Sequence, residues 1–157
     1  MNATELNVVL LCPEIPQNTG NIGRLCVNTD ATLHLVKPFV FSLEDKYLKR
    51  AGLDYWAHLR LKIHESVPDF LQFSSQGEKY FFSTKGKKCY WDCPFKPRTF
   101  IIFGNESSGF PSHIYQDYSN NMYHIPMPGK NARSLNLANA VAVVVYEFLR
   151  INSFHAG

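Results

Sequence analysis

Short apolar segments rich in β-branched and aromatic residues alternate along this chain with segments that suit helices, and this alternation constrains the fold more than any other feature. The expected strands are residues 7–11, 32–36, 59–63, 79–83, 99–103 and 122–125. The expected helices are residues 19–28, 45–51, 67–73, 111–116 and 134–151. Strands that alternate with helices favour a mostly parallel sheet with helices on both faces. The sequence therefore predicts an α/β fold.

The size and composition of the chain are those of one globular domain, residues 1–157. Hydrophobic residues make up 45% and charged residues 18%, and no long uncharged apolar run suggests a membrane-spanning helix. The first residues do not have the basic and apolar regions of a secretory signal, so we expect a cytoplasmic protein.

The cysteines and histidines do not have the spacing of a metal site. Two disulfides or one metal site are open in principle for the cysteines, but the paired two-residue spacing of structural zinc sites is missing, which favours free thiols. The cysteines are Cys12, Cys26, Cys89 and Cys93. The six histidines are scattered, so we expect structural or surface histidines and no metal.

Positive charge is modest overall, with a net charge of +3, but it is concentrated in two stretches that also contain aromatic residues. Eleven of the 16 lysines and arginines fall within residues 46–62 and 79–98. Such a mixture suits an RNA backbone with unstacked bases. A solvated lysine surface with inward-facing rings is the alternative, and this feature alone favours that second interpretation. Residues 85–98 are also expected to form a long loop.

The last expected helix is apolar on all sides between residues 140 and 146, so it needs cover on more than one face. The small residues Ala138, Ala140 and Ala142 allow close helix packing, which predicts a homodimer. A helix deep inside its own domain is the alternative.

Three segments combine glycine, proline and polar residues in a way that suits ligand binding: residues 13–24, 103–111 and 125–139. In the second of these, Gly104 permits close backbone approach and Glu106 presents a carboxylate at the carboxyl end of a strand. The glycine-rich phosphate-binding motifs of dinucleotide enzymes and P-loop NTPases are missing, as is a nucleophile elbow. Nucleoside triphosphate and dinucleotide chemistry are therefore not expected.

Taken in order, residues 18–24 (Asn-Thr-Gly-Asn-Ile-Gly-Arg), 103–111 (Phe-Gly-Asn-Glu-Ser-Ser-Gly-Phe-Pro) and 125–139 resemble the three motifs of the SpoU branch of SPOUT RNA methyltransferases. The resemblance implies a C-terminal deep trefoil knot, a homodimer and S-adenosylmethionine as cofactor. It also implies 2′-O-methylation of the wobble nucleotide, cytidine or modified uridine, in leucine tRNAs, with the anticodon stem-loop as the substrate. Alternatives are methylation of rRNA or of another tRNA position, and a non-catalytic RNA-binding protein on the same fold.

The resemblance also assigns roles to individual residues. The implied catalytic residues are Arg24, Glu106 and Asn136, and the implied cofactor-binding residues are Phe82, Gly104, Ile125 and Ser134. Lys85 and Tyr146 are the candidates for RNA contact, and Tyr146 is also a candidate for the dimer interface. Because arginine is almost never deprotonated, we expect Arg24 to bind phosphate and stabilise a developing alkoxide rather than act as a base.

Overall fold

The computed structural model describes residues 4–44, 46 and 55–152. Its strands are β1 (Glu5–Leu11), β2 (Thr32–Val36), β3 (Arg60–His64), β4 (Glu78–Phe82), β5 (Lys88–Cys89), β6 (Arg98–Phe103) and β7 (Met122–His124). Its α-helices are α1 (Pro16–Asn28), α3 (Val67–Phe73), α4 (Ser112–Asp117) and α5 (Leu137–Asn152). Within these described residues, three short 3₁₀ helices cover Trp56–His58, Tyr90–Asp92 and Ser119–Asn121.

The strands form one sheet in the order β3-β2-β1-β6-β4-β7-β5, and every pair of neighbouring strands in it is parallel. β1 lies in the interior and pairs with β2 on one side and β6 on the other. Parallel strands require crossovers, and helices supply most of them here. The predicted α/β fold with a parallel sheet is therefore confirmed.

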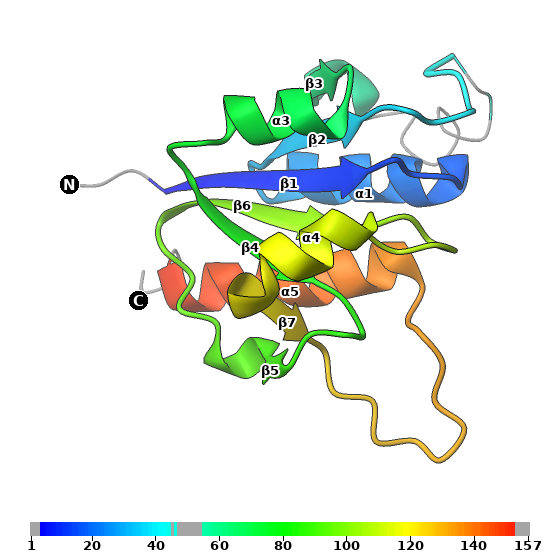
Figure 1. The fold of residues 1–157 in the computed structure, drawn as a ribbon. Coiled ribbons are helices and arrows are strands. Elements are labelled where there is room, and N and C mark those ends of the chain that lie inside the picture. The colour runs from blue at the N-terminus through cyan, green and yellow to red at the C-terminus, as the bar shows by residue number, and fades with distance from the viewer. Residues whose placement is uncertain (1–3, 45, 47–54, 153–157) are drawn as a thin grey trace.

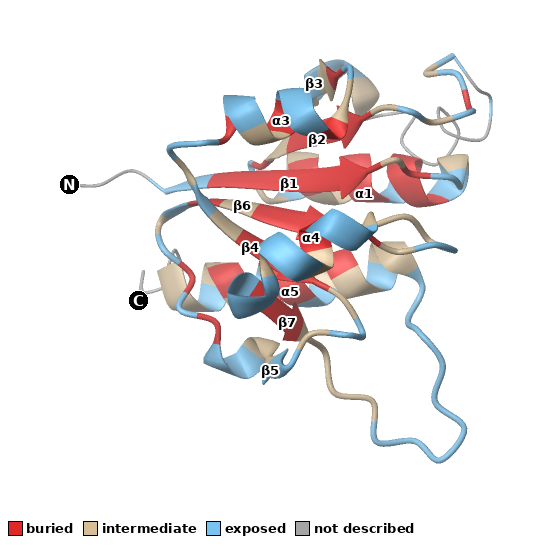
Figure 2. Ribbon diagram, in the orientation of Figure 1, coloured by how far each residue is buried: buried red, intermediate tan, exposed pale blue. Residues whose placement is uncertain are grey.

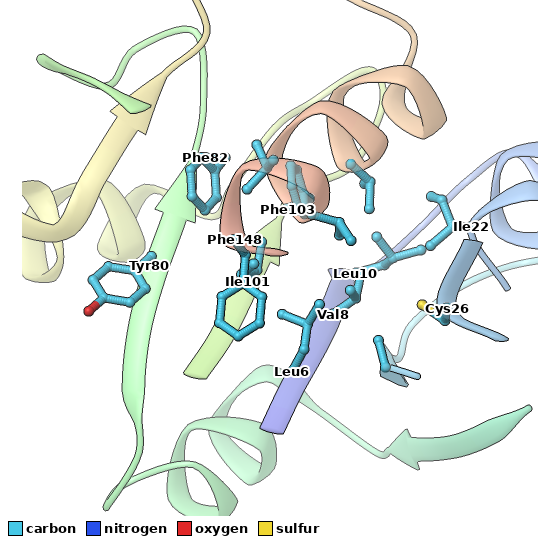
Figure 3. Close-up of a cluster of buried hydrophobic side chains, with 14 of the residues drawn as sticks. Leu6, Val8, Leu10, Ile22, Cys26, Tyr80, Phe82, Ile101, Phe103 and Phe148 are labelled. Carbon is cyan, nitrogen blue, oxygen red and sulfur yellow. The ribbon is translucent and has the colours of Figure 1, made fainter. Parts of the chain in front are cut away.

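Helices cover both faces of the sheet (Figure 1). Alternate residues of β1 point to opposite faces: Val8 and Leu10 join the cluster under α1 and α5, whereas Val9 and Leu11 join the cluster under α3 and α4. All four are buried, as expected for a strand covered on both faces. Figure 3 shows the first cluster, with side chains from α1 and α5 packed on the central strands.

Most element boundaries agree with the sequence prediction within three residues. The boundaries of β2 and α3 are those predicted, while α1 begins three residues early, at Pro16, because proline suits the first turn of a helix. The predicted helix at residues 45–51 lies almost entirely outside the described residues.

Two predictions differ from the structure in ways that have a clear physical reason. The last helix begins at Leu137 rather than at residue 134, because the Oδ1 atom of Asn136 accepts the backbone N–H groups of Ala138 and Asn139 and so caps the helix. The predicted loop at residues 85–98 contains the short strand β5, which pairs with β7, and a 3₁₀ helix.

Helix α5 buries one face and leaves another open (Figure 2). Ala138 and Ala140 pack against the chain's own core, so two of the three small residues expected at a dimer interface are used within the chain. On the open side, Val143 is 38% exposed and Tyr146 55% exposed. Among the described residues, no helix has the length and hydropathy needed to cross a membrane.

Candidate functional site

A cavity of about 470 Å³ opens beyond the carboxyl ends of β4, β6 and β7. Its walls come from four stretches that are far apart in the sequence: residues 15–18, 82–85, 103–115 and 125–140. In open α/β sheets, ligands bind at this edge, outside the carboxyl ends of the strands. The cavity also has the volume of a typical small-molecule site.

The cavity brings together most of the residues that the sequence singled out. Its walls include all four predicted cofactor-binding residues, two predicted catalytic residues and one predicted RNA-binding residue. These are Phe82, Gly104, Ile125, Ser134, Glu106, Asn136 and Lys85. These residues do not lie together merely because they are close in the sequence, since Phe82 is the last residue of β4 and Asn136 immediately precedes α5.

Arg24 and Tyr146 lie outside the walls of this cavity. Arg24 is an exposed residue of α1, and its Cζ atom lies 4.8 Å from the ring centroid of Tyr55. Arg24 follows Asn18 by six positions, so its side chain points about 120° around the helix from that of Asn18, which lines the cavity. Tyr146 is on the open side of α5. The cavity of a single chain is thus built without either residue.

Both carboxylate oxygens of Glu106 are used in hydrogen bonds. Oε1 accepts the backbone N–H of Glu14, and Oε2 accepts that of Ile15, each over 2.9 Å. The Oε2 atom also accepts Nδ2 of Asn18 over 3.2 Å. Glu106 therefore ties the loop after β6 to the loop after β1, which gives it a positioning role in this chain.

Asn18 extends this connection to the last helix. Because its Nδ2 atom donates to a carboxylate, its Oδ1 atom is free to accept, and it does so from Nδ2 of Asn136 over 3.0 Å. Asn136 in turn caps α5. The three motif segments are thus joined by one chain of hydrogen bonds. We did not single out Asn18 from the sequence, although its place in the first motif was a signal.

The turn at residues 105–109 closes the cavity on the β6 side. Asn105 and Gly109 exchange two backbone hydrogen bonds of 3.0 Å, and Asn105 Oδ1 accepts the N–H groups of Ser107 and Ser108. A Cβ atom on Gly104 would lie 2.6 Å from the carbonyl carbon of Gly109. Glycine at position 104 is therefore needed for the turn to fold back over the end of β6.

The lining of the cavity is mixed. Phe82, Phe103 and Leu137 supply apolar surface, while Glu106 and Asn136 supply polar groups that are already held in place. Such a cavity suits a small molecule with one flat apolar part and one polar part. Within the part of the chain that the structure describes, no cluster of three or more histidine, cysteine or acidic side chains is placed to hold a metal ion.

Comparison with known proteins agrees with this arrangement. The model of the SpoU rRNA Methylase family matches residues 5–146. A tRNA (cytidine(34)-2'-O)-methyltransferase of Burkholderia ambifaria is 40% identical over 154 residues, which cover 96% of this chain and 98% of that protein.

Two solved structures also resemble this chain. A structure described as "Structural insights into the 2-OH methylation of C/U34 on tRNA" is 42% identical, with a TM-score of 0.88 over 94% of this chain and 95% of that chain. The SpoU methyltransferase AviRb from Streptomyces viridochromogenes, solved with AdoMet, is 23% identical, with a TM-score of 0.83 over 96% of this chain and 61% of that one. That last likeness concerns the fold. The resemblance seen in the three motifs is confirmed, and the chain belongs to the SpoU methylase family.

Proposed function

We propose that this protein transfers a methyl group from S-adenosylmethionine to the ribose 2′-oxygen of the wobble nucleotide, position 34, of tRNA. The observation that carries the proposal is the cavity, which joins all three family motifs at the carboxyl edge of the sheet. Membership of the SpoU family supports the reaction type. The 40% identity to a full-length tRNA (cytidine(34)-2'-O)-methyltransferase supports the position.

The cavity fits S-adenosylmethionine by size and lining. The rings of Phe82 and Phe103 and the side chain of Ile125 offer an apolar surface for the adenine, and Gly104 brings backbone close to the ligand. Ser134, which also lines the cavity, offers a hydroxyl group. We therefore assign Phe82, Gly104, Ile125 and Ser134 to the cofactor.

When bound, S-adenosylmethionine supplies a methyl carbon made electrophilic by the sulfonium sulfur. The ribose 2′-oxygen would attack this carbon in line, so that the O–C bond forms as the C–S bond breaks, S-adenosylhomocysteine leaves with the bonding electron pair and the hydroxyl proton passes to solvent water. Asn136, fixed by its bond to Asn18, orients the site, and Glu106 holds the loops that form it. Arg24 binds RNA phosphate and stabilises the developing alkoxide.

We propose that two chains form the working enzyme. Arg24 lies outside the chain's own cavity, yet the apolar side chains Ile15 and Leu135 line that cavity and remain 39% and 41% exposed. Val143 and Tyr146 are further exposed large hydrophobic residues, on α5. A second copy that covers them would bury these side chains and bring another Arg24 toward the cavity.

The finer features implied by the family resemblance belong to the same proposal. The chain forms a single domain, and the segment between β7 and α5 takes part in a deep trefoil knot. Ile125, Met127 and residues 134–136 of this segment line the cavity. The anticodon stem-loop of leucine tRNAs is the proposed substrate, with Lys85 at the cavity rim meeting its phosphates.

The proposal is tested with purified protein, labelled S-adenosylmethionine and bulk tRNA from a strain that lacks the enzyme. Nuclease digestion and mass spectrometry then locate the methylated ribose. We expect label at position 34. Label at another position or in rRNA would move the substrate elsewhere, and absence of both label and cofactor binding would contradict the methyltransferase assignment.

A further inference from the structure

Tyr115 of α4 contacts two parts of the cavity wall at once. The Nζ atom of Lys85 lies 4.8 Å from the centroid of its ring, on the wall formed after β4. Its hydroxyl accepts the backbone N–H of Phe110 over 3.1 Å, on the wall formed after β6. Tyr115 itself lines the cavity.

The hydroxyl of Tyr115 fits closely against the turn at residues 105–109. Gly109 has a φ of +71°, and a Cβ atom there would lie 2.6 Å from the Tyr115 hydroxyl oxygen. The backbone of Gly109 in turn lies against Gly104, where a Cβ would meet its carbonyl carbon at 2.6 Å. If the Tyr115 hydroxyl moved, Gly109 would have to move with it. The backbone of Gly104, which we assign to cofactor binding, would then move as well.

The ring of Tyr115 restricts an otherwise mobile cation. Lys85 is exposed and its long side chain has many rotamers, so a contact between its ammonium group and an aromatic face limits where the charge is found. Because both residues line the cavity, the charge is held at the rim, where an RNA phosphate would approach.

We propose that Tyr115 is a positioning residue with two separable contacts. Its hydroxyl holds the turn at residues 105–109 in the conformation that binds the cofactor, and its ring holds the Lys85 ammonium group in position to contact the RNA. This inference rests on the proposed function, since it assigns the turn after β6 to the cofactor and Lys85, after β4, to the RNA. The two contacts use different atoms of one side chain, so two substitutions separate them.

Tyr115→Phe keeps the ring and removes the hydroxyl, whereas Tyr115→Leu removes both. We expect Tyr115→Phe to raise the Kd for S-adenosylmethionine, measured by isothermal titration calorimetry, about 3- to 10-fold. Its Kd for an unmodified anticodon stem-loop, measured by fluorescence anisotropy, stays within about twofold of wild type. Tyr115→Leu weakens both, and its loss of RNA affinity matches that of Lys85→Ala.

Tyr118→Phe is the matched control, because Tyr118 follows the same helix and packs on Phe81; it leaves both Kd values unchanged. Hydrogen exchange of a peptide covering residues 105–111 in the ligand-free protein adds a readout that needs no cofactor, and exchange is faster in Tyr115→Phe. Wild-type exchange and a wild-type cofactor Kd in Tyr115→Phe would overturn the inference. Failure of the wild-type protein to bind S-adenosylmethionine would instead overturn the proposed function, with the exchange result still deciding the role of the hydroxyl.

Discussion

Asn136 donates its side-chain amide to Asn18 over 3.0 Å, across 118 positions of sequence. Asn18 passes the connection to Glu106, whose carboxylate also accepts the backbone N–H groups of Glu14 and Ile15. One polar chain therefore links the loop after β1, the loop after β6 and the start of α5. The shape of the cavity depends on these bonds, which makes their members the natural targets for substitution.

Glu106→Gln removes a charged acceptor and places an amide NH₂ against groups that are themselves donors. We expect the free energy of unfolding to fall by about 1–3 kcal/mol, because hydrogen bonds to a charged group are lost and backbone N–H groups are left without a full set of acceptors. Urea denaturation measures this change. Glu65→Gln, which alters an exposed ion pair with Lys37, serves as control and changes stability by less than about 0.5 kcal/mol. Equal effects of the two substitutions would contradict the positioning role of Glu106.

Gly104→Ala places a methyl group where the Gly109 backbone already lies. Overpacking of this kind costs about 1–3 kcal/mol, so the turn moves and the Kd for S-adenosylmethionine rises about tenfold or more. Gly129→Ala is the matched control, since a Cβ there meets no atom within 4 Å. Calorimetric titration of both variants checks the prediction, which fails if Gly104→Ala binds the cofactor as tightly as Gly129→Ala does.

A buried histidine pair on the α3 face of the sheet makes stability depend on pH. His34 Nδ1 lies 2.9 Å from His64 Nε2, and His34 Nε2 lies 2.8 Å from Asn7 Oδ1. Burial, with the nearby charges of His64 and Lys62, lowers the pKa of His34 from 6.5 to about 3. Below pH 6.5 the unfolded chain binds a proton that the folded chain does not, so stability is full above that pH and declines as the pH falls toward 3.

Because of His34, we expect the free energy of unfolding to fall by about 2 kcal/mol between pH 6.5 and pH 5, at about 1.4 kcal/mol per pH unit. Urea denaturation at pH 7 and pH 5 measures it as a difference between proteins: His34→Leu loses less stability over this interval than wild type does. The exposed His113 provides the control, and His113→Gln keeps the wild-type pH dependence. Parallel pH curves for wild type and His34→Leu would refute the assignment.

Arg24→Lys keeps the positive charge but removes the planar, bidentate guanidinium. We expect kcat for tRNA methylation to fall about 100-fold, while the Kd for S-adenosylmethionine is unchanged because Arg24 lies outside the cavity. Arg98→Lys, which alters an exposed ion pair with Glu5 at the opposite end of β6, is the control. Near-wild-type turnover of Arg24→Lys would contradict a role of the Arg24 guanidinium in the reaction. If Arg24 acts across a dimer, coexpression of Arg24→Lys with Gly104→Ala restores part of the activity that each variant lacks alone.

The sequence predicted those features that local physical rules determine. Apolar runs located six strands, and the boundaries of β2 agreed with the prediction because all of its residues but one are buried. The two-residue strand β5 has no such run, and its pairing with β7 defines it. The proposed cofactor-binding residues were assigned through motif resemblance, and all four line one cavity in the structure.

The hydrogen bonds of the site were out of reach for a different reason. Glu106 and Asn18 lie 88 positions apart, so no local pattern relates a carboxylate to its amide partner. The role of Tyr115 depends on how α4 folds back against Gly109, which its own sequence does not encode. The motif resemblance assigned Arg24 to the reaction, whereas the helical periodicity of α1 explains why its side chain points away from the cavity.

The most direct test uses two synthetic anticodon stem-loops that differ by one atom, the 2′-oxygen at position 34. Purified protein is incubated with labelled S-adenosylmethionine and each RNA, and methyl transfer is counted. The account predicts label in the ribose stem-loop and none in its 2′-deoxy-34 counterpart, with equal binding of the two RNAs. Equal labelling of both would contradict methylation of the wobble ribose.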